Sequence, residues 1–208
     1  MFQPVDGFDG ALHMVPDVHP DHRGTFHEWF KASSFEEALG FPFDLQQANI
    51  SSSRAGVLRG LHFSEAPPGQ AKLVTCPVGA IFDVLVDVRE GSPTYASWKA
   101  FELTAHNREA LFIPAGFAHG FLALEDSVVV YLTTAEYRPG VEHGVDPFDA
   151  SIDVAWPTME YVLSEKDGAA PSLDEVAAAE LLPGYDSCQE HADELRAGWA
   201  AAAEEAGL

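Results

Sequence analysis

The segment AKLVTCPVGAIFDVLVDVR, residues 71–89, carries the pattern that decides the fold. Because successive side chains of a strand point to opposite faces, the second half of the segment has one wholly apolar face, which consists of Phe82, Val84, Val86 and Val88. The other face alternates apolar and acidic side chains, Ile81, Asp83, Leu85 and Asp87. Pro77 and Gly79 separate this run from an earlier one, so the segment predicts two strands joined by a turn.

Short β-like runs continue outward from this segment, between Gln46 and about Tyr137. The runs KAFELTA, EALFIPAGFAHGFLAL and SVVVYLTTAEY follow one another at spacings of roughly ten residues, with turn residues between them and no helical period. Strands at this spacing without intervening helices favour an antiparallel sandwich or barrel. We therefore predict an all-β fold for the body of the chain.

Helical patterns occur only towards the two ends of the chain. Residues 33–40, SSFEEALG, have serines in front, glutamates in the first turn and a glycine at the end, as helices often do. The last part of the chain is rich in Ala and Glu and opens with Ser172 and Glu175 at the spacing of a capping box. We predict a β domain over residues 1–171 and a helical extension with a solvated acidic face over residues 172–208.

The charge of the chain is strongly acidic. Its 208 residues, which suit one main domain, include 33 Asp and Glu against 11 Lys and Arg, a net charge of −22. Such a surface repels nucleic acid and anionic membranes, because phosphate binding needs positive charge. Arg23, Arg59 and Lys72 are therefore the positions at which we expect an anionic ligand to be held.

The sequence also bears on the compartment. It has no run of about 18 or more apolar residues, and its N-terminus lacks a basic flank followed by an apolar stretch, so neither a membrane span nor an export signal is expected. Cys76 and Cys188 do not have metal-binding spacing. These features favour a reduced, cytoplasmic protein, with one long-range disulfide as the open alternative.

The stretch GVLRGLHF, residues 56–63, places an arginine and a histidine in what otherwise reads as a buried strand. In a regular strand Arg59 and His62 point to opposite faces, because they are an odd number of residues apart. Gly60 between them is typical of a β-bulge, which adds a residue and re-aims the side chains that follow. A bulge would turn both side chains toward one cavity; without it, His62 is a core histidine and Arg59 a surface residue.

A second segment, IPAGFAHGF at residues 113–121, contains Pro-x-Gly-x-x-His, which ends at His119. It resembles the second conserved box of cupin barrels, in which a Pro-Gly turn delivers a histidine to the barrel mouth. Cupin metal sites usually add a His-x-His and a Glu from the first box, whereas this chain offers only His62 there, with Glu65 as a loose third ligand. The motif therefore favours a cupin barrel without a metal site.

A barrel with an inward histidine and no metal suits proton transfer. Histidine carries protons near neutral pH, and a nearby cation stabilises an enolate that forms beside a carbonyl group. A hairpin could bring Lys72 back across the sheet toward His62, and the hydroxyl of Tyr131 could donate a proton from another wall. The predicted chemistry is removal and return of a proton next to a ketone.

Together these motifs resemble the dTDP-4-dehydrorhamnose 3,5-epimerase family, cupin-fold enzymes that act on sugar nucleotides. The likeness runs from about Phe8 to Ser172 and rests on six segments in order: DHRGTFHEWF, QQANISSSRAGVLRGLHF, AKLVTCPVGAIFDVLVDVREGSPTYASW, LFIPAGFAHGF, YLTTAEYRPGVEHG and LSEKDGAAPSL. The resemblance implies a jelly-roll β-barrel or sandwich with peripheral, mainly C-terminal helices. It also implies a homodimer, with no metal or other cofactor, that epimerises a dTDP-4-keto-6-deoxyhexose.

The resemblance implies a role for each matching residue. His62 is similar to the catalytic base, and Asp167 to the carboxylate that orients its imidazole. Lys72 matches the cation that stabilises the enolate oxygen at C4, and Tyr131 the acid that returns a proton on the opposite face. The other matches are substrate-binding positions: Arg23, Phe26, Glu28, Gln47, Asn49, Arg59, His119 and Tyr137. Because relatives share an N-terminal segment across their dimer interface, Arg23 and Glu28 are expected at the neighbouring subunit's site.

One segment departs from the family pattern. VEHGVDPFDASIDVAWP lacks the Trp-Asn pair that rhamnose-pathway members usually have, and it is more similar to epimerases of secondary metabolism. The inverted carbon, C3, C5 or both, is therefore left open. Two other functions also stay open: a metal-dependent cupin isomerase or dioxygenase, and a sugar-nucleotide-binding barrel without activity, against which the complete set of catalytic matches argues.

Overall fold

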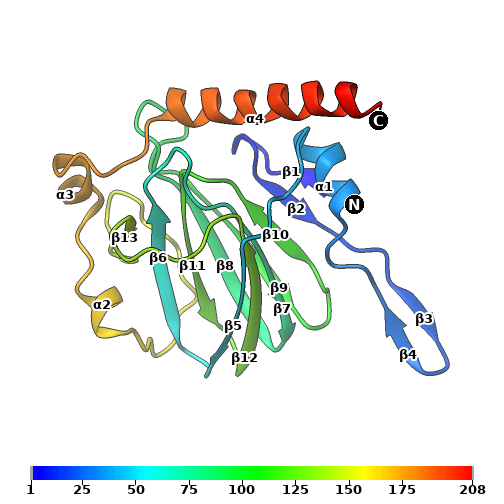
Figure 1. Ribbon diagram of the computed structural model, residues 1–208. Coiled ribbons are helices and arrows are strands. Elements are labelled where there is room, and N and C mark those ends of the chain that lie inside the picture. The colour runs from blue at the N-terminus through cyan, green and yellow to red at the C-terminus, as the bar shows by residue number, and fades with distance from the viewer. Residues whose placement is uncertain (1, 208) are drawn as a thin grey trace.

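The computed structural model describes residues 2–207, so residues 1 and 208, the outer ends of the two predicted ranges, lie outside the described part. Two antiparallel sheets pack face to face as a sandwich, and helices lie around them (Figure 1). The predicted all-β architecture with peripheral, mainly C-terminal helices is confirmed. Within residues 2–207, no helix is long and apolar enough to cross a membrane.

The strand order of the two sheets fixes which side chains can meet. The larger sheet has six strands in the order β1 (Phe2–Pro4), β2 (Leu12–Met14), β10 (Ala110–Ile113), β7 (Lys72–Val78), β12 (Ser127–Thr133) and β5 (Gln47–Ser53). The smaller sheet has five strands in the order β13 (Glu142–Gly144), β6 (Leu58–Ser64), β11 (Phe117–Ala123), β8 (Ala80–Asp87) and β9 (Trp98–Thr104). The two runs of the opening segment thus form β7 and β8, which belong to different sheets.

The space between the sheets holds one hydrophobic core. Val74 and Val129 of the larger sheet pack there with Ile81, Leu85 and Phe121 of the smaller sheet. The mixed face of β8 therefore points into the sandwich. Its two aspartates are compensated by close partners, because a buried charge without one is costly: Asp83 accepts a hydrogen bond from His119, and Asp87 bonds Arg89.

The wholly apolar face of β8 points outward and is covered by the chain that follows β13. Val84 and Val86 pack there against Trp156, Leu173 and Val176. Leu173 and Val176 belong to α3 (Leu173–Ala178), so the first helix of the predicted extension shares a core with the β domain. The domain division at residue 171 stays a prediction.

The helices follow most of their sequence signals. α1 (Ala32–Leu39) ends at Gly40, whose φ of +79° is the left-handed conformation that glycine favours, but it begins before the two serines and lacks a side-chain cap. α3 has the predicted capping box between Ser172 and Glu175. α4 (Tyr185–Ala206) lies across one end of both sheets (Figure 1), and α2 (Glu165–Gly168) is a single turn beside β6.

One element stands apart from the sandwich. β3 (His19–Asp21) and β4 (Gly24–Phe26) form a hairpin that projects away from both sheets (Figure 1). Phe26, the last residue of β4, is 65% exposed.

Candidate functional site

A β-bulge in β6 positions the central histidine. His119 of β11 lies opposite His62, but Phe121 lies opposite Arg59, so β6 carries one residue more than its partner over this stretch. Gly60 occupies the bulge with a φ of +114°, and a Cβ atom there would lie 2.5 Å from the Cα of Gly120. Only glycine fits that position. The bulge predicted from the sequence is confirmed.

The bulge gives Arg59 and His62 the same orientation. Directly paired residues of antiparallel strands share a face. Phe121, opposite Arg59, belongs to the core between the sheets, and His119, opposite His62, is two residues away on the same strand. Both polar side chains of β6 therefore face the interior of the sandwich.

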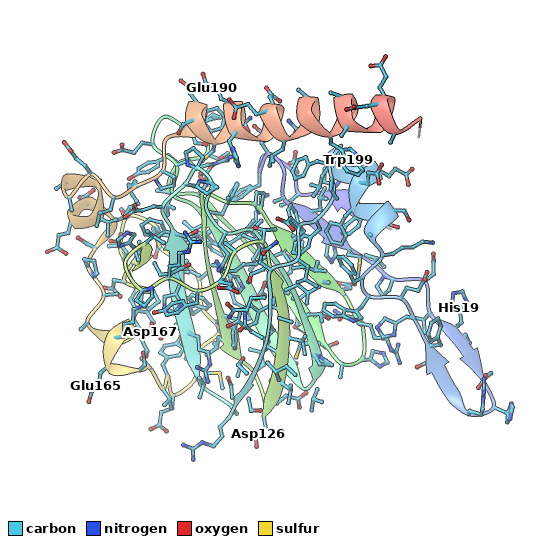
Figure 2. The ribbon with its side chains drawn as sticks, viewed as in Figure 1. His19, Asp126, Glu165, Asp167, Glu190 and Trp199 are labelled. Atoms are coloured by element: carbon cyan, nitrogen blue, oxygen red, sulfur yellow. The ribbon has the colours of Figure 1, made fainter. Side chains whose placement is uncertain are left out.

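His62 is bonded to a carboxylate from outside the sheets. Its Nε2 atom lies 2.6 Å from Oδ1 of Asp167. Asp167 belongs to α2, and Figure 2 labels it there. The hydroxyl of Ser164 caps α2 by accepting a hydrogen bond from the Asp167 backbone N–H. Burial raises the pKa of Asp167, but the His62 hydrogen bond and charge, with bonds from Ser164 and the Gly60 backbone, outweigh burial and lower it. Asp167 therefore stays ionised beside the imidazole.

The larger sheet supplies the opposite wall. Tyr131 lies opposite Asn49 and Val74, and Thr133 lies opposite Lys72. Because Val74 belongs to the core between the sheets, Tyr131, Asn49 and Lys72 all point inward.

Burial changes the pKa of two of these residues. Lys72 is buried, which lowers its pKa. Burial also raises the pKa of Tyr131, so its phenol stays protonated near neutral pH.

Electrostatic interactions connect the two walls. The charge of Arg59 lowers the pKa of Tyr131 and that of Glu142 raises it. Glu142 also raises the pKa of Lys72, and His62 lowers that of Glu142. Such effects need short separations. We call the residues so connected the site cluster: Arg59, His62, Lys72, Tyr131, Glu142 and Asp167.

His119 forms a second histidine–carboxylate pair next to the site cluster. Its Nε2 atom lies 2.7 Å from Oδ1 of the fully buried Asp83. The other oxygen of Asp83 has no hydrogen-bond partner among the described residues. As the cross-strand neighbour of His62, His119 faces the same interior.

Four of the predicted binding residues lie close together at the edge strand β5. Gln47 donates a hydrogen bond of 2.7 Å to Asn49 and accepts one of 2.9 Å from the Tyr137 backbone N–H. The guanidinium of Arg59, on β6, donates a hydrogen bond of 3.0 Å to the hydroxyl of Ser53 on β5. Gln47, Asn49, Arg59 and Tyr137 thus line one edge of the sandwich.

The N-terminal matches lie elsewhere in this chain. Arg23 and Phe26 sit on the projecting hairpin, where Arg23 pairs with Asp21. Glu28 follows the hairpin, and its carboxylate lies 3.9 Å from Lys31. These three residues are exposed, and none is hydrogen-bonded or ion-paired to the site cluster.

No metal-binding group is seen within residues 2–207, where no three His, Cys, Asp or Glu side chains converge. Glu65, the loose third ligand, pairs with His143 at 2.8 Å. Both candidate histidines bond carboxylates through Nε2. The expectation of no metal stays a prediction. A cavity of about 630 Å³ is lined in part by Phe112 and by Leu195 of α4, and no residue of the site cluster lines it.

Sequence reasoning missed two charged residues of this region. Glu142 lies in the quoted segment YLTTAEYRPGVEHG, but no local pattern indicated that it returns beside Lys72. Asp83 alternates with apolar residues on one face of the predicted strand, and this pattern was the signal in the sequence that could have indicated its role.

Comparison with known proteins gives a consistent picture. A family model described as dTDP-4-dehydrorhamnose 3,5-epimerase matches residues 7–175. A Mycobacterium tuberculosis protein named dTDP-4-dehydrorhamnose 3,5-epimerase is 46% identical over 191 residues, 90% of this chain and 95% of that one. A Streptomyces bikiniensis dTDP-4-dehydro-6-deoxyglucose 3-epimerase is 44% identical over 88% of this chain and 94% of that one.

Solved structures agree with these sequence matches. The Mycobacterium tuberculosis rmlC epimerase superposes with a TM-score of 0.91 at 44% identity, covering 94% of this chain and 99% of that one. ChmJ, a 3'-monoepimerase from Streptomyces bikiniensis in complex with dTDP-quinovose, has a TM-score of 0.90 at 42% identity and covers 93% and 98%.

Proposed function

The chain belongs to the dTDP-4-dehydrorhamnose 3,5-epimerase family, and we propose that its site cluster carries out the family reaction, epimerisation of a dTDP-4-keto-6-deoxyhexose beside the C4 ketone. The observation that carries the assignment is the pairing of His62 with Asp167 on one wall, opposite Tyr131 and Lys72 on the other. The activity belongs to deoxysugar biosynthesis.

In the first step His62 acts as the base. Its imidazole removes the proton from the carbon next to the ketone, the C–H electron pair forms the enolate double bond, and the ketone oxygen takes up the negative charge. Asp167 holds the imidazole in one orientation and stabilises the imidazolium. The Lys72 ammonium stabilises the enolate oxygen.

In the second step Tyr131 acts as the acid. Its phenol donates a proton to the opposite face of the carbon, the enolate returns to the ketone, and the configuration is inverted. Burial keeps the phenol protonated until then, and the charge of Arg59 stabilises the phenolate that is left. Exchange with water restores the phenol and the neutral imidazole.

The substrate-binding residues divide between two subunits of a homodimer. Arg59, Gln47, Asn49, His119 and Tyr137 contact the substrate from its own subunit. The hairpin residues Arg23 and Phe26, with Glu28, reach the site of the partner. Two observations support a dimer: the hairpin projects from the body, and large apolar side chains are exposed, Phe26 by 65% and Ile50 of β5 by 73%.

We further propose a cytoplasmic location and a reaction without metal. Cys76 and Cys188 are free thiols, which suits a reducing compartment. His62 and His119 are each hydrogen-bonded to a carboxylate, and this arrangement suits proton transfer best. The relatives include 3,5-epimerases and 3-epimerases, so inversion occurs at C3, C5 or both.

Incubation with dTDP-4-keto-6-deoxyglucose in deuterated water tests the proposal. Proton NMR should show deuterium entering at the inverted carbon and should assign it as C3 or C5. The His62→Asn variant should show no incorporation, and elemental analysis of the active protein should find no stoichiometric Fe, Mn or Zn. Full deuterium exchange in His62→Asn would refute the role of His62 as the base. No exchange in the parent protein would refute the proposed activity.

A further inference from the structure

We propose that Glu142 is a positioning residue that acts through Lys72: its carboxylate is the counter-ion that keeps the Lys72 ammonium charged while leaving its N–H donors free for the substrate. This inference rests on the proposed function, because it concerns the cation that stabilises the enolate there. Neither the sequence motifs nor the family match assigns a role to Glu142.

The ladder between β13 and β6 places Glu142 inside the sandwich. Glu142 lies opposite Ser64, and Gly144 lies opposite His62. Because His62 and Ser64 are two residues apart on one strand, Glu142 shares their face. Its carboxylate therefore lies on the same side of the sheet as the imidazole.

A hydrogen bond within the loop that joins β6 to β7 brings Lys72 to this position. The Ser64 hydroxyl accepts a hydrogen bond of 2.8 Å from the backbone N–H of Gln70. Gln70 precedes Lys72 by two residues, so the end of β6 is held next to the start of β7. Glu142, opposite Ser64, thus lies at the end of the sandwich where Lys72 begins its strand.

Lys72 needs a counter-ion that does not occupy its donors. The side chain is 8% exposed, and within residues 2–207 no carboxylate oxygen lies within 4.0 Å of its Nζ. No hydrogen bond from Nζ to the described protein is found either. Burial favours the neutral amine, and the charge of Glu142 is the influence that opposes it. A contact ion pair would instead commit donors that the ketone oxygen requires.

The groups around Glu142 support this role. Burial raises its pKa, and four positive or titratable neighbours lower it in this order: Lys72, His62, Lys166 and His143. The His143 ring is already bonded to Glu65. The charge of Glu142 also raises the pKa of Tyr131. At alkaline pH, where Lys72 loses its proton, the carboxyl is ionised and its effect on Lys72 is complete.

The test is the pH dependence of the deuterium-exchange rate, whose fall at high pH we call the alkaline limb. Glu142→Gln keeps the shape and removes the charge, so Lys72 should lose its proton earlier and the limb should move to lower pH by about one unit. Glu142→Asp should restore most of the shift. Glu65→Gln, which removes a more exposed carboxylate next to Ser64, should leave the limb unchanged.

Two backgrounds identify the group through which Glu142 acts. In Lys72→Arg the cation cannot lose its proton in the working range, so adding Glu142→Gln should shift nothing. In Tyr131→Phe the shift should persist, because exchange needs no phenol. An unchanged limb, a shift that survives in Lys72→Arg, or a rate loss equal at every pH would overturn the proposal. A parent protein without exchange would instead refute the proposed function.

Discussion

The Nε2 atom of His62 lies 2.6 Å from Oδ1 of Asp167, although 105 positions separate the two residues in the chain. The bulge at Gly60 points the imidazole inward, and the cap on α2 fixes the carboxylate. The base and the group that orients it thus come from a sheet and from the segment that folds back beside it.

Asp167→Asn should reduce the exchange rate by about 10²-fold to 10⁴-fold, because the amide can neither fix the tautomer nor stabilise the imidazolium. The measurement is deuterium incorporation at saturating substrate. Glu165→Gln changes an exposed carboxylate of the same helix and should have little effect. If the exchange rate of Asp167→Asn stayed within roughly threefold of the parent rate, Asp167 would not orient the imidazole.

Tyr131→Phe should slow inversion far more than exchange, by about 10²-fold for inversion, because His62 and Lys72 still form the enolate while the opposite face lacks its acid. NMR follows both rates in one sample. Tyr161→Phe, whose hydroxyl bonds the Pro157 carbonyl outside the cluster, should change neither. Equal loss of exchange and inversion would count against Tyr131 as the acid.

Gly60→Ala should destabilise the fold by about 3 kcal/mol, because the new Cβ would lie 2.5 Å from the Gly120 Cα and 2.7 Å from the His119 carbonyl oxygen. Gly91→Ala is the matched control. Gly91 also has a positive φ, +84°, but a Cβ there meets no atom within 4 Å, so it should cost about 1 kcal/mol. Urea unfolding measures both, and equal losses would show that the close approach is unimportant.

Asp87→Asn should destabilise the protein by about 3–5 kcal/mol at neutral pH, because Arg89 is 2% exposed and would be left without its counter-charge. Burial raises the pKa of Asp87, but bonds from Arg89, Ser92 and Thr94 outweigh burial and lower it.

The pH dependence of this effect follows from that direction. Since the folded pKa lies below the unfolded value near 3.8, the contribution of Asp87 is complete above about pH 4 and is lost as the pH falls through the folded pKa. Urea unfolding at several pH values should show the two proteins converging in acid. A difference that stays constant down to that range would contradict the ion pair as its source.

Co-expression of two inactive variants should restore activity if the hairpin serves the partner subunit. A mixed dimer of Arg23→Ala and His62→Asn then has one site with both residues intact, and about half the parent activity per mixed dimer is expected. Separate affinity tags isolate the mixed dimer. If Arg23 served its own subunit, each site would carry one defect and activity would stay at the level of the single variants.

Local pattern was enough for the elements and for part of the site. The period of two over residues 80–88 predicted a strand, Gly60 between Arg59 and His62 predicted a bulge, and Ser172 with Glu175 predicted a helix cap. Each of these features depends on residues within a few positions of one another, where backbone sterics and side-chain alternation act directly.

Only the tertiary structure decided which distant groups meet. Alternation in β8 could not tell that its mixed face lies inward, since both faces are buried and Asp83 is compensated there by His119. The placement of Glu142 near Lys72 depends on the order of strands in two sheets and on the Ser64–Gln70 hydrogen bond within the loop that joins β6 to β7. Periodicity encodes the face of a side chain within its own strand, whereas the neighbour across the sandwich is set by how the whole chain packs.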